Sequence, residues 1–382
     1  MTFKTLGLTL GLSAALCAAL TTAAAAEIKV GMITTLSGGG AGLGIDVRDG
    51  FLLAIERSGR DDIEVVIEDD QQKPDVAVQL ADKMVQSEKV DVLTGIIWSN
   101  LAMAVVPSVT AQGKFYLSPN AGPSALAGAG CHPNYFNVSW QNDAFYEAAG
   151  GWASENGIGS VMLMAPNYPA GVDGITGFKR FFKGEVKDEI YTTLGQTDYA
   201  AEIAQVKASD AEMLFYFLPG GMGISFMKQY AGSGADKPLM GPAFSFDQGI
   251  LGAIGDAALG VKNTAHWSKD LDAPGNAEFV AAFSEKYGRL PSLYAAQGYD
   301  TGLLLASAAA KADVDDADAF RAALMEADFQ SVRGAFRFAP NHHPIQTIYM
   351  REVVKEGDVV TNRIIGTAAT EHTDVYGADC KM

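Results

Sequence analysis

Short apolar runs and amphipathic runs alternate along the first third of the chain. Four apolar runs have the length and composition of strands: 28–33, 63–67, 90–97 and 115–117. Between them, apolar residues recur at helical spacing over 43–55 and 77–85. Strands that alternate with helices at this pitch predict a parallel sheet joined by crossover helices. We therefore expect a doubly wound α/β lobe in this part of the chain.

The same alternation restarts after Gly150-Gly151. Strand-like runs recur at 161–165, 186–193, 213–218 and 239–240. Helical patterns lie between them at 177–182, 201–208 and 222–230, with a further helix from about Gly249. Two successive halves of this kind predict an α/β fold with two doubly wound, Rossmann-like lobes, although no residue-level repeat relates the halves.

The chain becomes helical from Gly275 and then β-like towards its end. Helical patterns cover 279–287, 293–311 and 317–327, and β-like runs follow at 333–338, 346–354 and 359–366. We expect the helices to return to the first lobe. A chain that crosses between lobes several times forms a multi-strand hinge. The expected division is 27–145 with 271–333 for lobe 1, and 146–270 with 334–382 for lobe 2.

The first residues have the features of a secretory signal peptide. Lys4 precedes an almost wholly apolar stretch over 6–20, and Ala24-Ala25-Ala26 fits the small-residue rule for cleavage. We predict a signal peptide at 1–26 and export to the periplasm, with an uncleaved membrane anchor as the alternative. Leu16 before Cys17 argues against a lipoprotein. No later apolar run is long enough to cross a bilayer.

The charge of the chain narrows the possible binding partners. The formal net charge is −17, and no cluster of Lys and Arg is interleaved with aromatic residues. This argues against nucleic acid or anionic membrane surfaces as partners.

With Cys17 in the signal peptide, Cys131 and Cys380 remain, and in an oxidising compartment we expect them to form a disulfide. Two separate thiols are the alternative.

The common catalytic and cofactor motifs are missing from the sequence. The glycine-rich stretch 37–44 does not fit the G-x-G-x-x-G spacing, and no Lys-Ser or Lys-Thr follows it. The five histidines, at 132, 266, 342, 343 and 372, lack the H-x-x-x-H spacing of a metal site. No G-x-S-x-G is present. We expect no enzyme activity, no cofactor and no metal, with an exported hydrolase assembled in space as the rival of another class.

Polar and aromatic residues instead follow the predicted strands, at the edge where open α/β sheets bind ligands. After the run 90–97 come Trp98, Ser99 and Asn100, with Ser99 or Asn100 expected at a helix N-cap. Such a helix start favours an anion. The other candidates at predicted strand ends are Ser118, Asn120, Ala121, Gly122, Tyr168, Phe217 and Phe244.

In their order along the chain, these segments resemble the periplasmic binding proteins of the leucine/isoleucine/valine type. The resemblance rests on 30–38, 95–99, 118–121, 168–171 and 295–300. It implies a monomeric two-lobed receptor, of the type I periplasmic binding fold, that closes on a small solute and delivers it to an ABC transporter permease. A sensor presenting its ligand to a membrane receptor would share this fold. By the same resemblance, Ser99 and the turn 118–122 hold the ligand carboxylate, and Tyr168 closes from the other lobe.

One departure from that family bears on the ligand. Members that bind amino acids carry an acidic residue just after a Gly-Pro-like turn, whereas this chain has Gly241-Pro-Ala-Phe244 and no carboxylate before Asp247. A buried ammonium without a partner is costly. With Trp98, Phe217 and Phe244 as flat apolar walls, we expect a small aromatic carboxylate, such as a benzoate or cinnamate derivative. A branched-chain or other amino acid or amide is the alternative.

Overall fold

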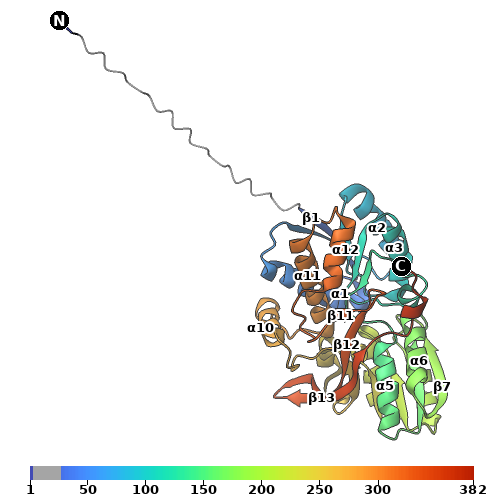
Figure 1. The fold of residues 1–382 in the computed structure, drawn as a ribbon. Helices are drawn as coiled ribbons and strands as arrows, with labels where there is room; N and C mark the ends of the chain where they lie inside the picture. Colours follow the sequence, from blue (N-terminus) through green and yellow to red (C-terminus); the bar gives the residue numbers. More distant parts are fainter. Residues whose placement is uncertain (3–26) are drawn as a thin grey trace.

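Two β-sheets, each covered by helices, form the two lobes of the computed structural model (Figure 1). The structure describes residues 1–2 and 27–382, so the predicted signal peptide lies almost entirely outside the described residues. No helix in the described part of the chain combines the length and apolarity needed to cross a membrane.

The first sheet is parallel throughout and has the strand order β2-β1-β3-β4-β5. Its strands are β1 Ile28–Thr34, β2 Ile63–Asp69, β3 Val92–Thr94, β4 Phe115–Ser118 and β5 Tyr135–Asn137. The connections contain η1 Gly38–Gly40, α1 Ala41–Ser58, α2 Pro74–Lys83, η2 Met84–Glu88, α3 Ser99–Ala111 and α4 Ser124–Ala127. This is a doubly wound order, in which the carboxyl ends of the strands share one edge.

The second sheet has the order β11-β12-β10-β9-β8-β6-β7, with β13 paired to β12. Its first part contains α5 Ala144–Glu155, β6 Ser160–Pro166, α6 Pro169–Phe181, β7 Glu185–Thr192, α7 Ala200–Ala208, β8 Met213–Tyr216, α8 Gly221–Gly232, β9 Leu239–Pro242, η3 Ala243–Ser245, α9 Gln248–Ile254, η4 Gly255–Ala258 and β10 Lys262–Ala265. Strands β6 to β10 are parallel, whereas β12 runs antiparallel to β10 and to β13.

The last third of the chain contributes to both sheets. It contains α10 Asn276–Tyr287, α11 Leu293–Lys311, α12 Ala317–Glu326, β11 Arg337–Phe338, β12 Pro344–Glu356, β13 Val359–His372 and η5 Gly377–Asp379. Helix α11 packs along α1 beside the first sheet. The two helices approach closely at Gly50, where a Cβ atom would lie 2.0 Å from the carbonyl oxygen of Ala295.

Several predicted elements differ from the structure. The run 90–97 is a strand only over Val92–Thr94, because Gly95 takes φ +106° and turns the chain. The helix predicted at 177–182 begins at Pro169, where a proline costs no hydrogen bond. The run 333–338 is a strand only over Arg337–Phe338. The elements that were not predicted include β5 and β10, which are short, and α5, which runs through Gly150-Gly151.

Helix α5 also bears on the predicted division into lobes. It packs against α6, β9 and β10 of the second sheet. The predicted boundary between 145 and 146 therefore falls just inside this helix, which begins at Ala144. The exact limits of the lobes remain a prediction.

A buried arginine joins the segments that connect the two sheets. Arg333 Nε donates to Asp300 Oδ2 of α11 at 2.6 Å. Its other nitrogens donate to the carbonyl oxygens of Val138 and Ser139, which follow β5, and to Gln346 Oε1 at the start of β12. Because one guanidinium satisfies groups from several connecting segments, it fixes them relative to one another.

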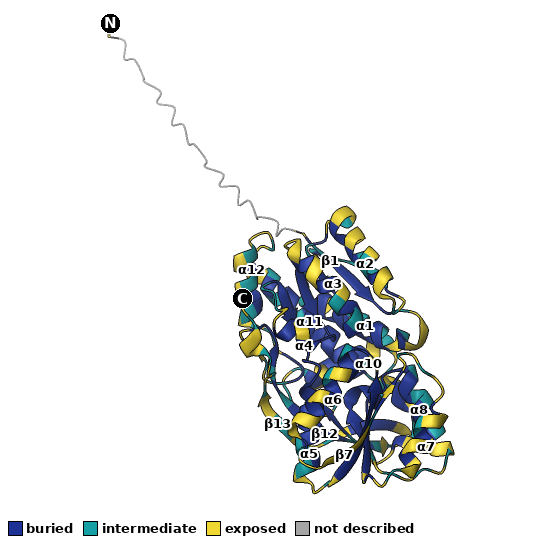
Figure 2. Cartoon of the chain, turned by 90° about the vertical axis from the view of Figure 1, so that its right-hand side faces the viewer, coloured by how far each residue is buried: buried dark blue, intermediate teal, exposed yellow. Residues whose placement is uncertain are grey.

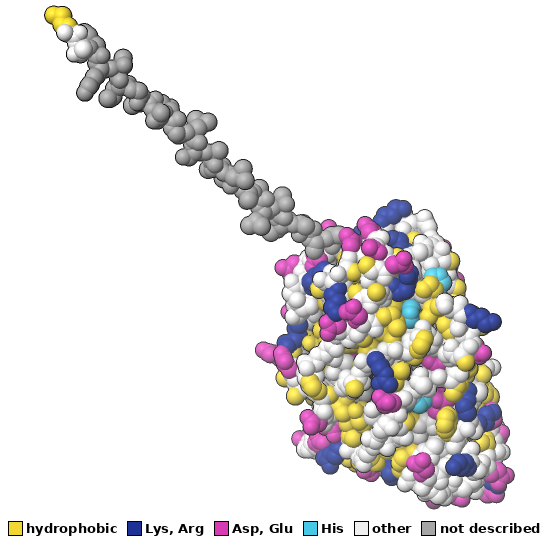
Figure 3. All heavy atoms as spheres, in the orientation of Figure 1, with side chains coloured by type: hydrophobic (Ala, Val, Ile, Leu, Met, Phe, Trp, Pro, Cys, Tyr) yellow, Lys and Arg dark blue, Asp and Glu magenta, His cyan; other side chains and the backbone are white. Residues whose placement is uncertain are grey.

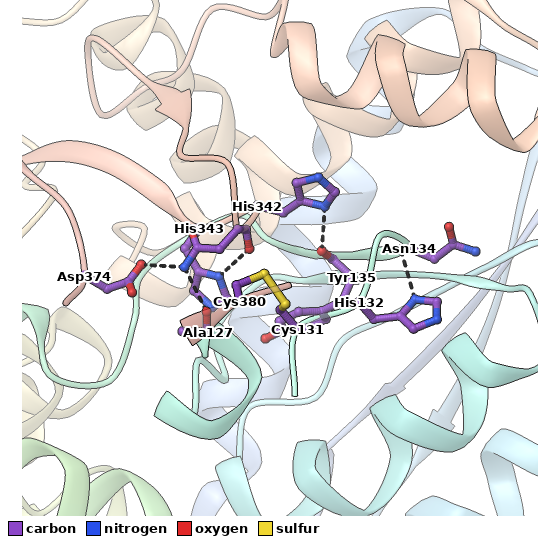
Figure 4. The surroundings of a disulfide bond; sticks show 10 residues. Ala127, Cys131, His132, Asn134, Tyr135, His342, His343, Asp374 and Cys380 are labelled. Carbon is purple, nitrogen blue, oxygen red and sulfur yellow. Dashed lines mark hydrogen bonds between the residues drawn. A yellow bond between two sulfur atoms is a disulfide. The ribbon is translucent and has the colours of Figure 1, made fainter. Parts of the chain in front are cut away.

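The C-terminal tail fastens the second sheet to the first. Cys380 forms a disulfide with Cys131, which lies between α4 and β5, and the Cα atoms are 5.6 Å apart (Figure 4). The predicted pairing is therefore confirmed. Within the tail, the Tyr376 hydroxyl donates to Asp143 Oδ2 at 2.8 Å, and Arg180 of α6 donates to the Tyr376 hydroxyl at 3.1 Å.

The distribution of side chains follows the layered fold. The strands are mostly buried, whereas α2, α7, α8 and α12 turn exposed residues outwards (Figure 2). Acidic and basic side chains are interspersed over the face drawn in Figure 3, with no extended basic area on it. The carboxyl edges of the parallel strands remain the expected position of a ligand site.

The disulfide should contribute strongly to stability. A Cys131→Ser/Cys380→Ser double variant should lose about 2–5 kcal/mol of unfolding free energy, because its unfolded chain is no longer constrained over 249 residues. Urea unfolding followed by circular dichroism measures this. Reductant should destabilise the wild type and leave the double variant unchanged. A double variant as stable as the oxidised wild type would contradict the assignment.

Candidate functional site

A small cavity lies where the carboxyl ends of the parallel strands of both sheets face each other. Its volume is only about 10 Å³, roughly what one water molecule needs, so the two lobes must move apart before a small molecule can enter. Its lining residues come from both sheets and the segments between them: Leu43, Ile97, Trp98, Ser99, Asn120, Trp140, Asn142, Tyr168, Ala170, Phe217, Pro219, Phe244 and Tyr294.

Two helices begin at this cavity. Ser99 is the first residue of α3, and Ala170 is the second residue of α6, which follows Tyr168. The first N–H groups of a helix have no acceptor within the helix, and the helix end carries a partial positive charge. Two such ends at one cavity provide donors for an anion without any charged side chain.

The predicted N-cap at Ser99 or Asn100 is wrong. The N-cap is Trp98, in extended backbone at φ −98° and ψ 126°, and its side chain makes no capping bond. The Ser99 hydroxyl therefore does not cap the helix. It lies 3.2 Å from Asn142 Nδ2 and 3.3 Å from Asn142 Oδ1, on the segment that follows β5.

Asp173 of α6 connects the two sides of the cavity. Its Oδ2 accepts a hydrogen bond from Asn142 Nδ2 at 2.9 Å and from the backbone N–H of Ser124 at 3.0 Å. Ser124 begins α4 beside the first sheet, so these bonds hold the two halves together. They also orient the Asn142 amide next to Ser99.

Aromatic rings form most of the wall. Successive ring centroids lie 6.2 Å apart from Trp98 to Tyr168, 6.2 Å from Tyr168 to Phe217 and 6.1 Å from Phe217 to Phe244. Phe244 in turn lies 4.4 Å from Trp140. The rings contact one another and are buried, so the cavity presents flat apolar surfaces suited to a ring.

The glycine-rich stretch approaches the opposite lobe at the rim of the cavity. A Cβ atom at Gly220, which has φ +61° before α8, would lie 3.0 Å from the carbonyl oxygen of Gly39. A Cβ atom at Gly40 would lie 2.7 Å from Trp98 Cζ2. Leu43 of the same stretch lines the cavity. The glycines therefore let the two backbones and the Trp98 indole come together.

Six of the ten predicted ligand residues line the cavity: Trp98, Ser99, Asn120, Tyr168, Phe217 and Phe244. The other four, Asn100, Ser118, Ala121 and Gly122, are not among the lining residues. The Ser118 hydroxyl donates to the carbonyl oxygen of Ala121 at 2.6 Å and so shapes its own turn. The roles of all ten in binding remain predictions.

Sequence reasoning missed Leu43, Ile97, Trp140, Asn142, Ala170, Pro219 and Tyr294. Ile97, Ala170 and Pro219 adjoin residues that were predicted, so a wider window at each strand end would have included them. Trp140 and Asn142 lie between β5 and α5. Neither of those elements was predicted, so their sequence context gave no signal.

No lining side chain carries a charge. The carboxylate nearest in sequence to Phe244 is that of Asp247, which is 1% exposed and is not among the lining residues. It accepts hydrogen bonds from the backbone N–H of Leu293 at 2.8 Å and of Gly249 at 3.2 Å. Asp247 is thus engaged at the starts of α11 and α9, and burial raises its pKa to about 6.

The lining residues also do not form a catalytic set. None of them is a histidine, an acid or a lysine that could act as a base for Ser99. Across the described residues, no group of three or more His, Cys, Asp or Glu side chains is arranged to hold a metal ion. The arrangement is suited to binding a small anion that carries an apolar ring.

The chain is similar to known proteins over most of its length. A family profile described as periplasmic binding protein matches residues 27–358. The Leu/Ile/Val-binding protein homolog 6 of Brucella melitensis is 30% identical over 355 residues, which cover 88% of this chain and 90% of the relative.

Two solved structures are similar to this chain over most of their length. An ABC transporter solute-binding protein from R. palustris, in complex with benzoate, is 33% identical with a TM-score of 0.88, covering 93% of this chain and 99% of that chain. A second ABC transporter solute-binding protein, from Rhodopseudomonas palustris BisB5 in complex with 3,4-dihydroxybenzoic acid, is 30% identical with a TM-score of 0.83. The match covers 91% of this chain and 98% of that chain.

The buried Asp247 should make stability depend on pH. Its pKa of about 6 lies above the value of roughly 3.9 expected for an unfolded chain, so the folded state binds this proton more tightly. The contribution of Asp247 to the unfolding free energy should therefore rise as the pH falls from 7 to 5. Urea unfolding at both pH values should show a smaller rise for Asp247→Asn than for the wild type. An equal rise would contradict the assignment.

Proposed function

Because the chain belongs to the periplasmic binding protein family, we propose that it captures a small aromatic carboxylate between its lobes and delivers it to an ABC transporter permease. Members of this family are exported solute receptors of ABC transporters. The predicted signal peptide at 1–26 accounts for export of this chain to the periplasm.

The observation that carries the proposal is the combination of two helix starts and a wall of aromatic rings around an uncharged cavity. The starts of α3 and α6 favour a carboxylate, by about 0.3–1 kcal/mol per helix end and more when partly buried. Each aromatic contact to a ligand ring adds roughly 0.5–1.5 kcal/mol beyond the burial of its area. The helix starts thus suit the carboxylate of a benzoate-like ligand, and the aromatic wall suits its ring.

The surroundings of Phe244 favour an aromatic acid over an amino acid. An α-amino acid brings an ammonium group, and none of the lining side chains is an acid that could pair with it. Asp247 is buried and already accepts two backbone N–H groups. Leaving an ammonium unpaired in the cavity would be costly. The benzoate and dihydroxybenzoic acid held by the two solved relatives lack this group.

Binding is proposed to stabilise a closed arrangement of the lobes. In the structure Asp173 already bridges the lobes through Asn142 and Ser124. A ligand shifts an open and closed equilibrium only by its difference in affinity for the two states. A carboxylate that contacts both α3 and α6 meets both helix starts only when the lobes are closed, so it supplies that difference.

A thermal-shift screen tests the ligand class. Benzoate, cinnamate and their hydroxylated forms should raise the melting temperature, because a ligand at one hundred times its Kd stabilises by about 2.7 kcal/mol. Leucine, isoleucine and valine should have little effect. Stabilisation by these amino acids but by no aromatic acid would support the branched-chain alternative, in keeping with the name of the Brucella relative.

Ser99 gives a sharper test of the anion site. A Ser99→Ala variant should weaken binding of the aromatic acid by about 1–3 kcal/mol, because a buried carboxylate oxygen loses a donor. Isothermal titration calorimetry measures the change. Ser108→Ala is a matched control, since Ser108 is exposed near the other end of α3. If Ser99→Ala binds as tightly as the control, the carboxylate lies elsewhere.

A further inference from the structure

The indole nitrogen of Trp140 is a buried donor at the cavity without an acceptor. Trp140 lines the cavity and is 2% exposed. Among the described residues its Nε1 atom has no hydrogen-bond partner. Its ring packs against Phe145 at 4.9 Å and Phe244 at 4.4 Å, which fixes the position of the indole.

Four other polar side chains of the lining, those of Trp98, Ser99, Asn120 and Asn142, have hydrogen-bond partners within the protein. Trp98 Nε1 donates to Thr35 Oγ1 at 2.9 Å, and Asn120 Nδ2 donates to Gln297 Oε1 at 2.7 Å. Ser99 and Asn142 are within hydrogen-bond distance of each other. Buried donors almost always have partners in folded proteins, and an exception calls for an explanation. A ligand with an acceptor at this point would supply the missing partner.

Trp140 is connected to the anion site by a series of rings. Trp98, which adjoins Ser99, is followed by Tyr168, Phe217 and Phe244 at steps of about 6 Å. Trp140 packs against Phe244 at 4.4 Å. A ligand ring that packs along this series from the starts of α3 and α6 therefore brings its substituent to Trp140.

We propose that the ligand is an aromatic acid with an oxygen substituent on its ring, and that Trp140 Nε1 donates a hydrogen bond to that oxygen. This inference rests on the proposed function and narrows its substrate class to hydroxybenzoates and similar acids. Trp140 is then a residue that determines specificity. An unsubstituted or methyl-substituted ring leaves the indole N–H without an acceptor and binds more weakly.

Calorimetric titrations with benzoate, 4-methylbenzoate, 3-hydroxybenzoate and 4-hydroxybenzoate test this. In the wild type, the better hydroxybenzoate should bind about tenfold more tightly than 4-methylbenzoate, which fills similar space without an acceptor. Trp140→Phe should remove this ratio while still binding benzoate. Trp98→Phe is the matched control, because the Trp98 N–H already donates to Thr35. It should weaken all four acids alike and preserve the ratio.

The possible outcomes separate the two proposals. If 4-methylbenzoate binds the wild type as tightly as either hydroxybenzoate, the role of Trp140 is overturned while the aromatic-acid function stands. The same holds if Trp140→Phe weakens all four acids equally, since that indicates a purely structural role. If none of the acids binds the wild type, the proposed function fails. If the wild type shows no preference for a hydroxybenzoate, the role of Trp140 is overturned even if Trp140→Phe does not fold.

Discussion

A buried ion pair is central to how the two sheets are held together. Arg333 and Asp300 side chains are 1% and 0% exposed, and burying such a pair is expensive unless every remaining donor is satisfied. Here the other guanidinium nitrogens bond to the carbonyl oxygens of Val138 and Ser139 and to Gln346. Because these partners lie on segments that connect the sheets, the pair sets how the two carboxyl edges face each other. The cavity exists only where those edges meet.

The cavity between these edges has no charged side chain in its lining, and this affects which ligands it can hold. The helices α3 and α6 follow strands of different sheets, and Ser99 and Ala170, in their first turns, line the same small volume. Partial charges at helix ends act more strongly where little water enters. An anion can thus be held without an arginine or lysine. A cation has no corresponding partner among the lining side chains.

The sequence predicts well what depends on local periodicity. The alternation of strands and helices predicts both sheets, and the rule that ligands bind at carboxyl ends of strands predicts Trp98, Tyr168, Phe217 and Phe244 at the cavity. Trp140 escapes prediction because it lies on a connecting segment, whose course is held by side-chain bonds from Arg333 and Asn137 and not by helix or strand periodicity. The predicted capping role of Ser99 is wrong because Trp98 occupies the N-cap position and the Ser99 hydroxyl is at hydrogen-bond distance from the Asn142 amide.

Asp247 is close in sequence to the lining residue Phe244 but does not line the cavity itself. It lies three positions after Phe244, where a carboxylate could have met a ligand ammonium. The start of α9 requires an N-cap there, and Asp247 accepts from Gly249 for that reason. Its other oxygen accepts from Leu293 at the start of α11. Both oxygens therefore bind backbone N–H groups, and the wall beside Phe244 is left to aromatic rings. The proposed preference for an aromatic acid over an amino acid thus rests on which backbone groups hold this one carboxylate.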